Sequence, residues 1–233
     1  MARLLPTLEQ SDGHMPIEAF ASQTSRAFAG LLFAGLASCA SGQPPQAAKA
    51  DFDGRTMQWC DKTGPDTDCS ELARFAPAGM TIRARARGDL DGDGDEDLLI
   101  VVEHDTDQSA SIPRGLLLLR RDAAGDLHES LNSPEAILCR KCGGMMGDPL
   151  QEVRVGHGDF TLRFEGGSRE LWSSEYRFEH AHDRELWLLA DIVHSGFDRA
   201  DGRIAERRLT VSDFGEVSLK SFHPEDYPAD ALP

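Results

Sequence analysis

Residues 89 to 97 carry Asp or Glu at six of nine positions, and this acidic segment lies between two strand-like stretches. Before it, Ile82, Ala84 and Ala86 alternate with arginines, which is the period-two pattern of a half-buried strand. After it, residues 98 to 103 form a nearly continuous apolar run, typical of a central strand. So many carboxylates on one short connection repel one another unless a cation gathers them. The segment therefore predicts a cation-binding loop between two strands.

The spacing of these acids fits the pattern D-x-D-x-D-G-x-x-D, which suits Ca²⁺ because calcium prefers six to eight oxygen ligands. An EF-hand is excluded, since its twelfth loop position needs a bidentate acid and is Ile100 here. A closed carboxylate cage offers no open position for a substrate, so we expect a structural ion. The alternative is a solvated acidic turn without an ion. The expected ligands, with Asp95 contributing its backbone carbonyl, are Asp89, Asp91, Asp93, Asp95 and Asp97.

This loop resembles the calcium loops of FG-GAP and VCBS-type modules, in which the same pattern joins two strands. In those families the loops recur along the blades of a propeller. The present sequence has one copy. The resemblance therefore implies a metal loop and does not imply a propeller.

The segment from Ala27 to Ala37 is apolar over eleven residues. It is too short to cross a bilayer core of roughly 30 Å as a helix, but it suits the core of a signal peptide. The residues from Leu36 to Cys39 resemble the bacterial lipobox, which implies cleavage before Cys39 and lipidation of that cysteine. Met15 is a possible true start. The alternative is a short buried helix with a structural cysteine.

Residue Ala40 stands where many inner-membrane lipoproteins carry a retention aspartate. We therefore expect an exported lipoprotein of the outer membrane that faces the periplasm or the cell surface. The predicted organisation is a signal peptide over residues 1–38, lipidated Cys39 with a flexible tether over 39–50, a β-rich domain over 51–222 and a loose tail over 223–233. The tether prediction follows from its small, polar and proline-bearing residues.

With Cys39 acylated, four cysteines remain, an even number that fits an oxidising compartment. Four cysteines allow three connectivities. Proximity along the chain favours pairing Cys60 with Cys69 and Cys139 with Cys142. The C-x-x-C spacing of the second pair could also support thiol exchange. However, a thioredoxin-like site needs a helix start within a βαβ pattern, and glycine-rich residues follow here, so we favour a structural disulfide. Zinc is a weaker alternative, because a zinc ribbon would need a second closely spaced pair.

The remaining pattern is mainly β. A short helix is expected at 70–75, with Ser70 as its N-cap. The second half reads as successive antiparallel hairpins, which we expect to turn at residues 156–158, 181–184 and 213–215. We predict a single antiparallel meander that forms a twisted sheet or open barrel with few short helices. The expected strands are 82–87, 98–103, 116–120, 152–155, 159–165, 171–180, 185–194, 207–212 and 216–222.

Residues 80 to 190 together resemble a group of uncharacterised bacterial envelope proteins. The shared features are the acidic GDLDGDG loop, the C-x-x-C-G-G segment followed by Gly-Asp-Pro, and a Gly-Gly-Ser strand with aromatic residues. The resemblance implies no activity. Trp172, Tyr176, Phe178 and Trp187 alternate on facing strands, and we expect core or cross-strand pairs, with a ligand-stacking platform as the alternative.

Four histidines, His157, His180, His182 and His194, fall at expected turns or strand ends. His180 and His182 have a spacing that can chelate a transition metal, although exposed turn histidines often bind nothing. No serine lies in the G-x-S-x-G context of a hydrolase elbow.

The formal net charge of −16 argues against a nucleic acid partner, which would require clustered Lys and Arg. The leading hypothesis is a non-catalytic, calcium-stabilised lipoprotein that acts as a binding or scaffold module. Its sheet face or the glycine-rich segments 143–148 and 166–168 would meet an envelope protein or a glycan. The alternatives are an envelope thiol oxidoreductase, a hydrolase that uses acids near the loop, and an inhibitor or immunity-type protein.

Overall fold

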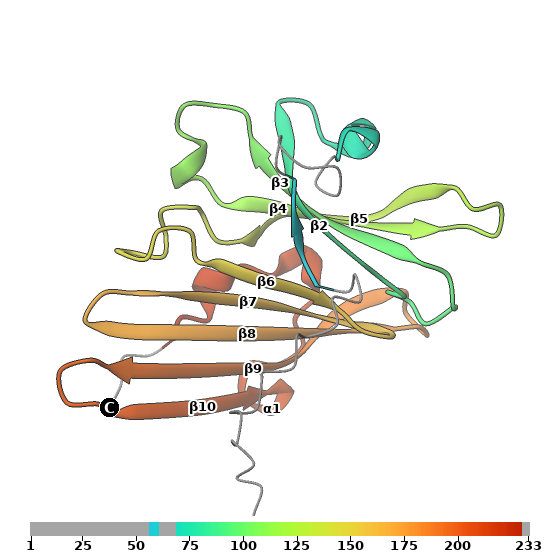
Figure 1. Ribbon diagram of the computed structural model, residues 1–233. Coiled ribbons are helices and arrows are strands. Elements are labelled where there is room, and N and C mark those ends of the chain that lie inside the picture. Colours follow the sequence, from blue (N-terminus) through green and yellow to red (C-terminus); the bar gives the residue numbers. More distant parts are fainter. Residues whose placement is uncertain (1–55, 61–68, 230–233) are drawn as a thin grey trace, which may run out of the picture. The chain divides into compact units, whose positions relative to one another are not determined.

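The computed structural model of the chain describes residues 56–60 and 69–229. Within these residues the strands form two antiparallel sheets of five strands each, with each sheet following the chain order (Figure 1). The first sheet contains β1 (Gln58–Trp59), β2 (Met80–Gly88), β3 (Asp97–His104), β4 (Arg114–Arg121) and β5 (Leu127–Ile137). The second contains β6 (Leu150–Val155), β7 (Asp159–Gly167), β8 (Glu170–Ala181), β9 (Leu186–Asp198) and β10 (Ile204–Thr210). The predicted mainly β, antiparallel meander is confirmed. The predicted signal segment 27–37, Cys39 and the tether lie outside the described residues.

The meander is divided between two sheets instead of continuing through one. After β5 the chain makes a series of turns over residues 138–149, where the Cys139–Cys142 disulfide closes a short loop. There Arg114, which is fully buried, donates two hydrogen bonds to the Asp148 carboxylate at 2.9 and 2.7 Å. This ion pair ties the connection between the two sheets to β4.

Both faces of the first sheet are covered, which explains the continuous apolar runs of β3 and β4. On one face, Leu98, Ile100 and Val102 pack with Leu72 of the short helix η1 (Ser70–Phe75). On the other face, alternate residues such as Leu99 join the core between the sheets. Burial of a side chain of this size contributes about 1.5–3 kcal/mol, so both faces stabilise the central strands.

The main core lies between the two sheets. Along β7, Phe160, Leu162 and Phe164 are buried while the residues between them are half-buried. Phe178 stacks on Phe160 at a centroid distance of 5.0 Å. The expected core positions of the aromatic residues are confirmed for Tyr176, Phe178 and Trp187, and Trp172 packs partly against the core.

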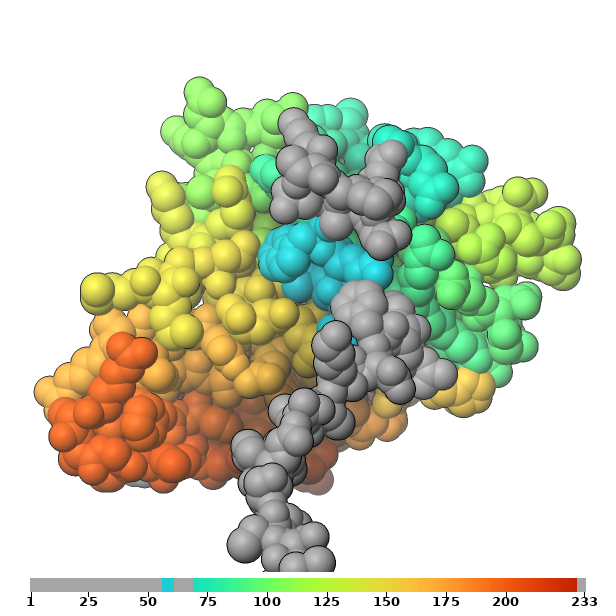
Figure 2. Space-filling view, in the orientation of Figure 1, coloured from blue at the N-terminus to red at the C-terminus, as the bar shows by residue number. Residues whose placement is uncertain are grey.

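The backbones of the two sheets come close at what we call the sheet junction. There Gly88, the last residue of β2, and the following Asp89 and Leu90 lie against residues 155–158. A Cβ on Gly88 would approach Val155 Cγ1 to 2.6 Å, so only glycine fits without a shift. The Gly158 amide donates to the Asp89 carbonyl at 3.0 Å. Close by, Met57 donates to the Val153 carbonyl, and Figure 2 shows the segment 56–60, in cyan, on the surface between the green and yellow parts of the two sheets.

The helices are short. Among the described residues, no helix combines the length and apolar character that crossing a membrane requires. Besides η1 they are η2 (Ser109–Ser111), α1 (Val211–Phe214), η3 (Leu219–Ser221) and η4 (Pro224–Asp226).

Instead of the strand expected at 216–222, η3 buries Leu219, and Phe222 is buried beside it. The segment after Phe222 was expected to be loose. It is instead tied down through residue 227, since Tyr176 Oη donates to the Tyr227 carbonyl at 2.9 Å. The buried aromatic residues of the core require a cover on this side, which the C-terminal segment supplies.

Candidate metal centre

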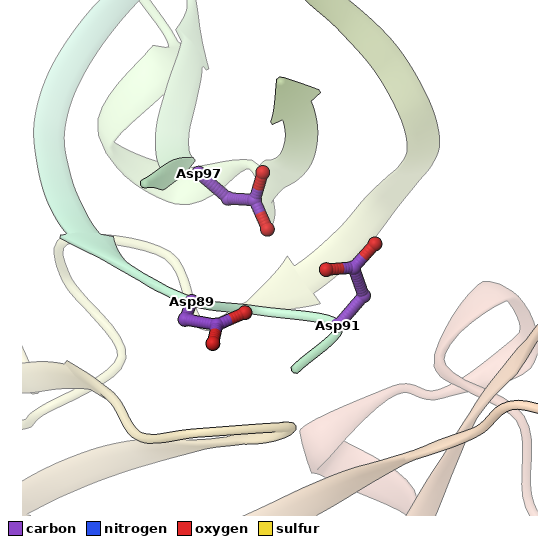
Figure 3. Close-up of side chains that lie close together, drawn as sticks. All are labelled: Asp89, Asp91 and Asp97. Atoms are coloured by element: carbon purple, nitrogen blue, oxygen red, sulfur yellow. The ribbon is translucent and has the colours of Figure 1, made fainter. Parts of the chain in front are cut away.

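Three aspartates of the acidic loop converge. Asp89 follows β2, Asp91 lies in the loop and Asp97 opens β3. One carboxylate oxygen from each lies within 4.8 Å of the others. Figure 3 shows the three carboxylates turned toward a common space. Asp97 is fully buried and Asp91 is 3% exposed. Among the described residues this is the one set of three or more acids, cysteines or histidines whose ligand atoms already lie this close together, and no ion is present.

Backbone amides hold the loop in this shape. The Asp93 amide donates to Asp91 Oδ1 at 3.3 Å, and the Asp95 amide donates to Asp93 Oδ1 at 2.8 Å. The Gly94 amide donates to Asp89 Oδ2 at 3.1 Å. Gly92 and Gly94 have φ values of +76° and +97°, which glycine adopts without the clash of a Cβ. The alternating carboxylates therefore shape the loop by hydrogen bonding to amides further along it.

Asp97 fixes the far end of the loop. Its Oδ2 accepts the Leu90 amide at 3.0 Å, and its Oδ1 accepts the Arg121 amide of β4 at 2.8 Å. Burial raises the pKa of Asp97 above its ordinary value, and the nearby carboxylate of Asp91 acts in the same direction. The two amides oppose that rise. The charged form of Asp97 is thus disfavoured by its surroundings, and a bound cation would relieve this.

Two oxygens of the triad accept no hydrogen bond. They are Asp89 Oδ1 and Asp91 Oδ2, and both are buried. The Arg120 guanidinium forms an ion pair with Asp91 Oδ2 without hydrogen-bond alignment, and it also pairs with Glu185 at 3.2 Å. A buried charged oxygen without a hydrogen bond is unfavourable unless it is paired or coordinates a metal. Asp91 Oδ2 is therefore balanced by Arg120, whereas Asp89 Oδ1 has neither a hydrogen bond nor an ion pair and is the ligand position that the protein leaves open.

The structure separates the five expected ligands into two groups. Asp89, Asp91 and Asp97 come together, whereas Asp93 and Asp95 are exposed and stay outside the triad. Asp91 is buried beside Asp97, whereas the exposed Asp93 side chain accepts the Asp95 amide. The triad is able to hold a metal ion, and any contribution from Asp93 or from the carbonyl of Asp95 stays a prediction.

Sequence reasoning missed the groups that surround the loop. His157, in the turn between β6 and β7, places Nδ1 at 2.6 Å from Asp89 Oδ2. Arg120 comes from the end of β4, and Glu185 comes from the turn between β8 and β9. Each is far from residues 89–97 in sequence. The Gly-His-Gly turn at 156–158 was a visible hairpin signal, but nothing in it indicated which loop it would meet.

The disulfides join the expected pairs, Cys60 with Cys69 and Cys139 with Cys142. Cys139 is 5% exposed. The adjacent Arg140 donates to Glu103 Oε1 at 2.7 Å, so its charge is already paired with a carboxylate. The motif lies in turns after β5 and no helix begins there.

The two glycine-rich segments expected to meet a partner lie side by side, because the Gly167 amide donates to the Gly143 carbonyl at 2.9 Å. Next to them is a groove of about 290 Å³ whose lining includes Met146, Trp172 and Phe197.

A serine and a histidine also make contact, away from the loop. Ser174 Oγ lies 2.9 Å from His194 Nδ1. Ser174 is 2% exposed and His194 is 7% exposed, and Tyr176 packs edge-on against His194. A substrate would have to enter the core to reach this pair. No family model, no curated protein and no solved structure matches the chain.

Proposed function

We propose that this protein is a non-catalytic module stabilised by calcium, which acts as a binding or scaffold lipoprotein of the cell envelope. The observation that carries the proposal is the convergence of Asp89, Asp91 and Asp97 with two buried oxygens that accept no hydrogen bond. An ion at this place would offset most of the negative charge of the triad and steady Asp89, whose carbonyl accepts the Gly158 amide at the sheet junction.

Calcium is the ion that the donor set favours. The three ligand groups are carboxylates, and hard divalent cations prefer oxygen ligands. Magnesium requires a small, nearly octahedral site, whereas calcium accepts a flexible arrangement completed by carbonyls and water. The exposed edge of the loop, at residues 92–96, leaves room for such additional oxygen ligands.

Three features support a non-catalytic role. The triad is fixed by amides and sits where an ion would stabilise the junction. The Cys139–Cys142 bond lies in a loop that Arg114 and Asp148 brace, outside the setting of a thiol oxidoreductase. The Ser174–His194 pair is enclosed in the core. The export, outer-membrane placement and lipidation at Cys39 belong to the same proposal and are supported by the lipobox resemblance and by the two disulfides, which suit an oxidising compartment.

We infer that a glycan is the partner that the groove suits. Trp172 and Phe197 offer apolar ring surface, while Glu165, Ser173 and Ser195 supply polar groups within the same lining, the mixture typical of a small-molecule pocket. Tryptophan fluorescence with soluble peptidoglycan fragments tests this. We expect quenching that Trp172→Phe abolishes and that the exposed Trp59→Phe retains. Equal quenching in both variants would remove the glycan from the proposal.

The calcium proposal is tested by scanning calorimetry of the purified full chain in calcium, in magnesium and in EDTA. Calcium at a hundred times its dissociation constant adds about 2.7 kcal/mol to the free energy of unfolding, so we expect a clear rise in melting temperature relative to EDTA. Magnesium should give a smaller rise. Equal melting temperatures in calcium and EDTA, with no calcium found by elemental analysis, would contradict the proposal.

A further inference from the structure

Three histidines gather at the edge of the acidic loop and take no part in the triad. His157 comes from the β6–β7 turn, His180 lies near the end of β8, and His182 lies in the β8–β9 turn. A Cβ added to Gly92 would lie 3.7 Å from His157 Nε2 and 3.8 Å from His182 Cε1. Two hairpin ends of the second sheet therefore bring their imidazoles to the same side of the loop.

His180 and His182 form a close pair. Their Nδ1 atoms are 3.2 Å apart, and their rings are nearly perpendicular at 81°. Two nitrogens bound to one tetrahedral zinc ion at 2.0–2.1 Å are separated by about 3.3 Å. The pair is thus already spaced as two ligands of a single ion.

A carboxylate lies on the side of the His180 ring that faces away from His182. Its side chain is 3% exposed and packs against Trp187 at a centroid distance of 5.1 Å. Its Nε2 lies 3.8 Å from Glu185 Oε2, and Arg120 holds Glu185. A carboxylate on the far side of an imidazole is the usual second partner of a metal-binding histidine, because it orients the ring and raises its basicity.

His157 repeats this arrangement. Its Nδ1 lies 2.6 Å from Asp89 Oδ2, and its side chain is 76% exposed. The Asp89 carboxylate therefore occupies one nitrogen, and Nε2 remains on the exposed side, next to Gly92. The same added Cβ on Gly92 would lie 3.8 Å from His182 Cε1, so the imidazoles of His157 and His182 flank one glycine.

We propose that His180 and His182 chelate a zinc-class transition-metal ion through their Nδ1 atoms, with His157 Nε2 as a third ligand and water completing the site. Imidazole suits zinc, copper and nickel, whereas the carboxylates of the triad suit hard cations. The chain would then carry two cation sites beside the β2–β3 loop, one with carboxylate ligands and one with imidazole ligands. This inference does not depend on the calcium proposal, because its ligands are separate from the triad.

Isothermal titration with Zn²⁺ tests the site, using the full chain with Cys39→Ser so that no thiol outside the disulfides competes. Calcium is kept present throughout. We expect one zinc per chain, with affinity reduced at least about tenfold in His182→Gln and less in His157→Gln. His182 is the decisive position because it is exposed, whereas His180 also packs in the structure. The matched control is His128→Gln. His128 is exposed, as His182 is, and it contacts an aspartate, Asp122, at 2.8 Å, as His157 contacts Asp89.

Co²⁺ serves as a spectroscopic probe, and we expect visible absorption bands that disappear in His182→Gln. Asp97→Asn should remove calcium binding and leave zinc binding in place, which separates failure of this inference from failure of the calcium proposal. The inference is overturned if the wild-type chain takes up no zinc, or if a folded His182→Gln variant binds zinc as tightly as the wild type. Zinc binding lost in Asp97→Asn but kept in His182→Gln would also overturn it.

Discussion

The loop after β2 and the turn after β9 both place aspartates and a left-handed glycine on a short connection between antiparallel strands. In the β9–β10 turn, Asp198 accepts the Ala200 amide at 2.7 Å and pairs with Arg169, while both oxygens of Asp201 accept hydrogen bonds from Arg203. In the β2–β3 loop, two buried oxygens of the triad accept none.

The β2–β3 loop and the β9–β10 turn differ in the groups that contact their carboxylates rather than in the presence of acids. Amides and guanidinium groups donate hydrogen bonds to the carboxylates of the β9–β10 turn, so that turn is stable without an ion. In the β2–β3 loop, amides, Arg120 and His157 contact the triad, yet Asp89 Oδ1 is left without a partner. An acidic pattern in a sequence therefore indicates a cation site only when the fold withholds enough internal donors.

The largest expected effect is that of Asp97→Asn. The amide of Asn cannot accept both the Leu90 and Arg121 amides in the way the carboxylate does. We expect the free energy of unfolding to fall by about 2–4 kcal/mol and the calcium response to disappear. Urea denaturation in calcium and in EDTA measures both. Asp201→Asn, in the other turn, is the control and should change stability by no more than about 0.5 kcal/mol. An equal loss of free energy of unfolding in Asp97→Asn and Asp201→Asn would contradict the difference drawn between the two connections.

The double change Asp91→Ala with Asp93→Ala should act mainly through the ion. In calcium we expect a loss of about 2–3 kcal/mol, because the stabilisation by bound ligand is gone. In EDTA the change should be small, since removing two carboxylates also removes repulsion around Asp97. Melting temperatures in the two buffers measure the effect. A penalty of the same size in EDTA would mean that these side chains stabilise the loop without an ion.

Arg120→Gln should strengthen calcium binding. The guanidinium competes with a cation for Asp91, and a partly exposed ion pair of this kind is worth up to about 1 kcal/mol. We therefore expect calcium affinity to rise about three- to fivefold, measured by calorimetric titration. Arg203→Gln removes a guanidinium from the other turn and should leave calcium affinity as it is. Weaker binding in Arg120→Gln would show that the arginine supports the site instead of competing for it.

The smallest expected effect concerns acid. The pKa of Asp198 lies below its ordinary value, chiefly because the Ala200 amide donates to it and Arg169 pairs with it. A lowered carboxyl pKa stabilises the fold fully above the unfolded-state pKa, and this contribution is lost as the pH falls through the lowered folded-state pKa. We expect Asp198→Asn to flatten the acid side of the stability curve in EDTA. Urea denaturation at a series of pH values measures this, and curves parallel to the wild type would contradict it.

The local part of the fold was readable from the sequence. The alternation before residue 89 and the apolar run after it predicted β2, β3 and the loop between them, because period and burial are local signals. Strand β5 was missed. It contains polar residues and Pro134, which cannot donate to a ladder, and its pairing with β4 shifts register twice.

The non-local part could not be read in the same way. The connection between the two sheets is tied to β4 by the pair of Arg114 with Asp148, which are 34 residues apart. The contact of His157 with Asp89 joins residues 68 apart. Spacing named the correct loop as the candidate site, but it could not tell Asp91 from Asp93. That distinction depends on which side chain the neighbouring strands bury.

The backbone bond between Gly158 and Asp89 and the carboxylate of the same Asp89 lie at one point where the sheets touch. All three carboxylates of the triad belong to the β2–β3 loop, so an ion bound there would reach the second sheet only through Asp89. By holding Asp89 in place, such an ion would steady the backbone position that accepts the Gly158 amide. Order in one short loop would thereby be passed to the hairpin turn of the neighbouring sheet.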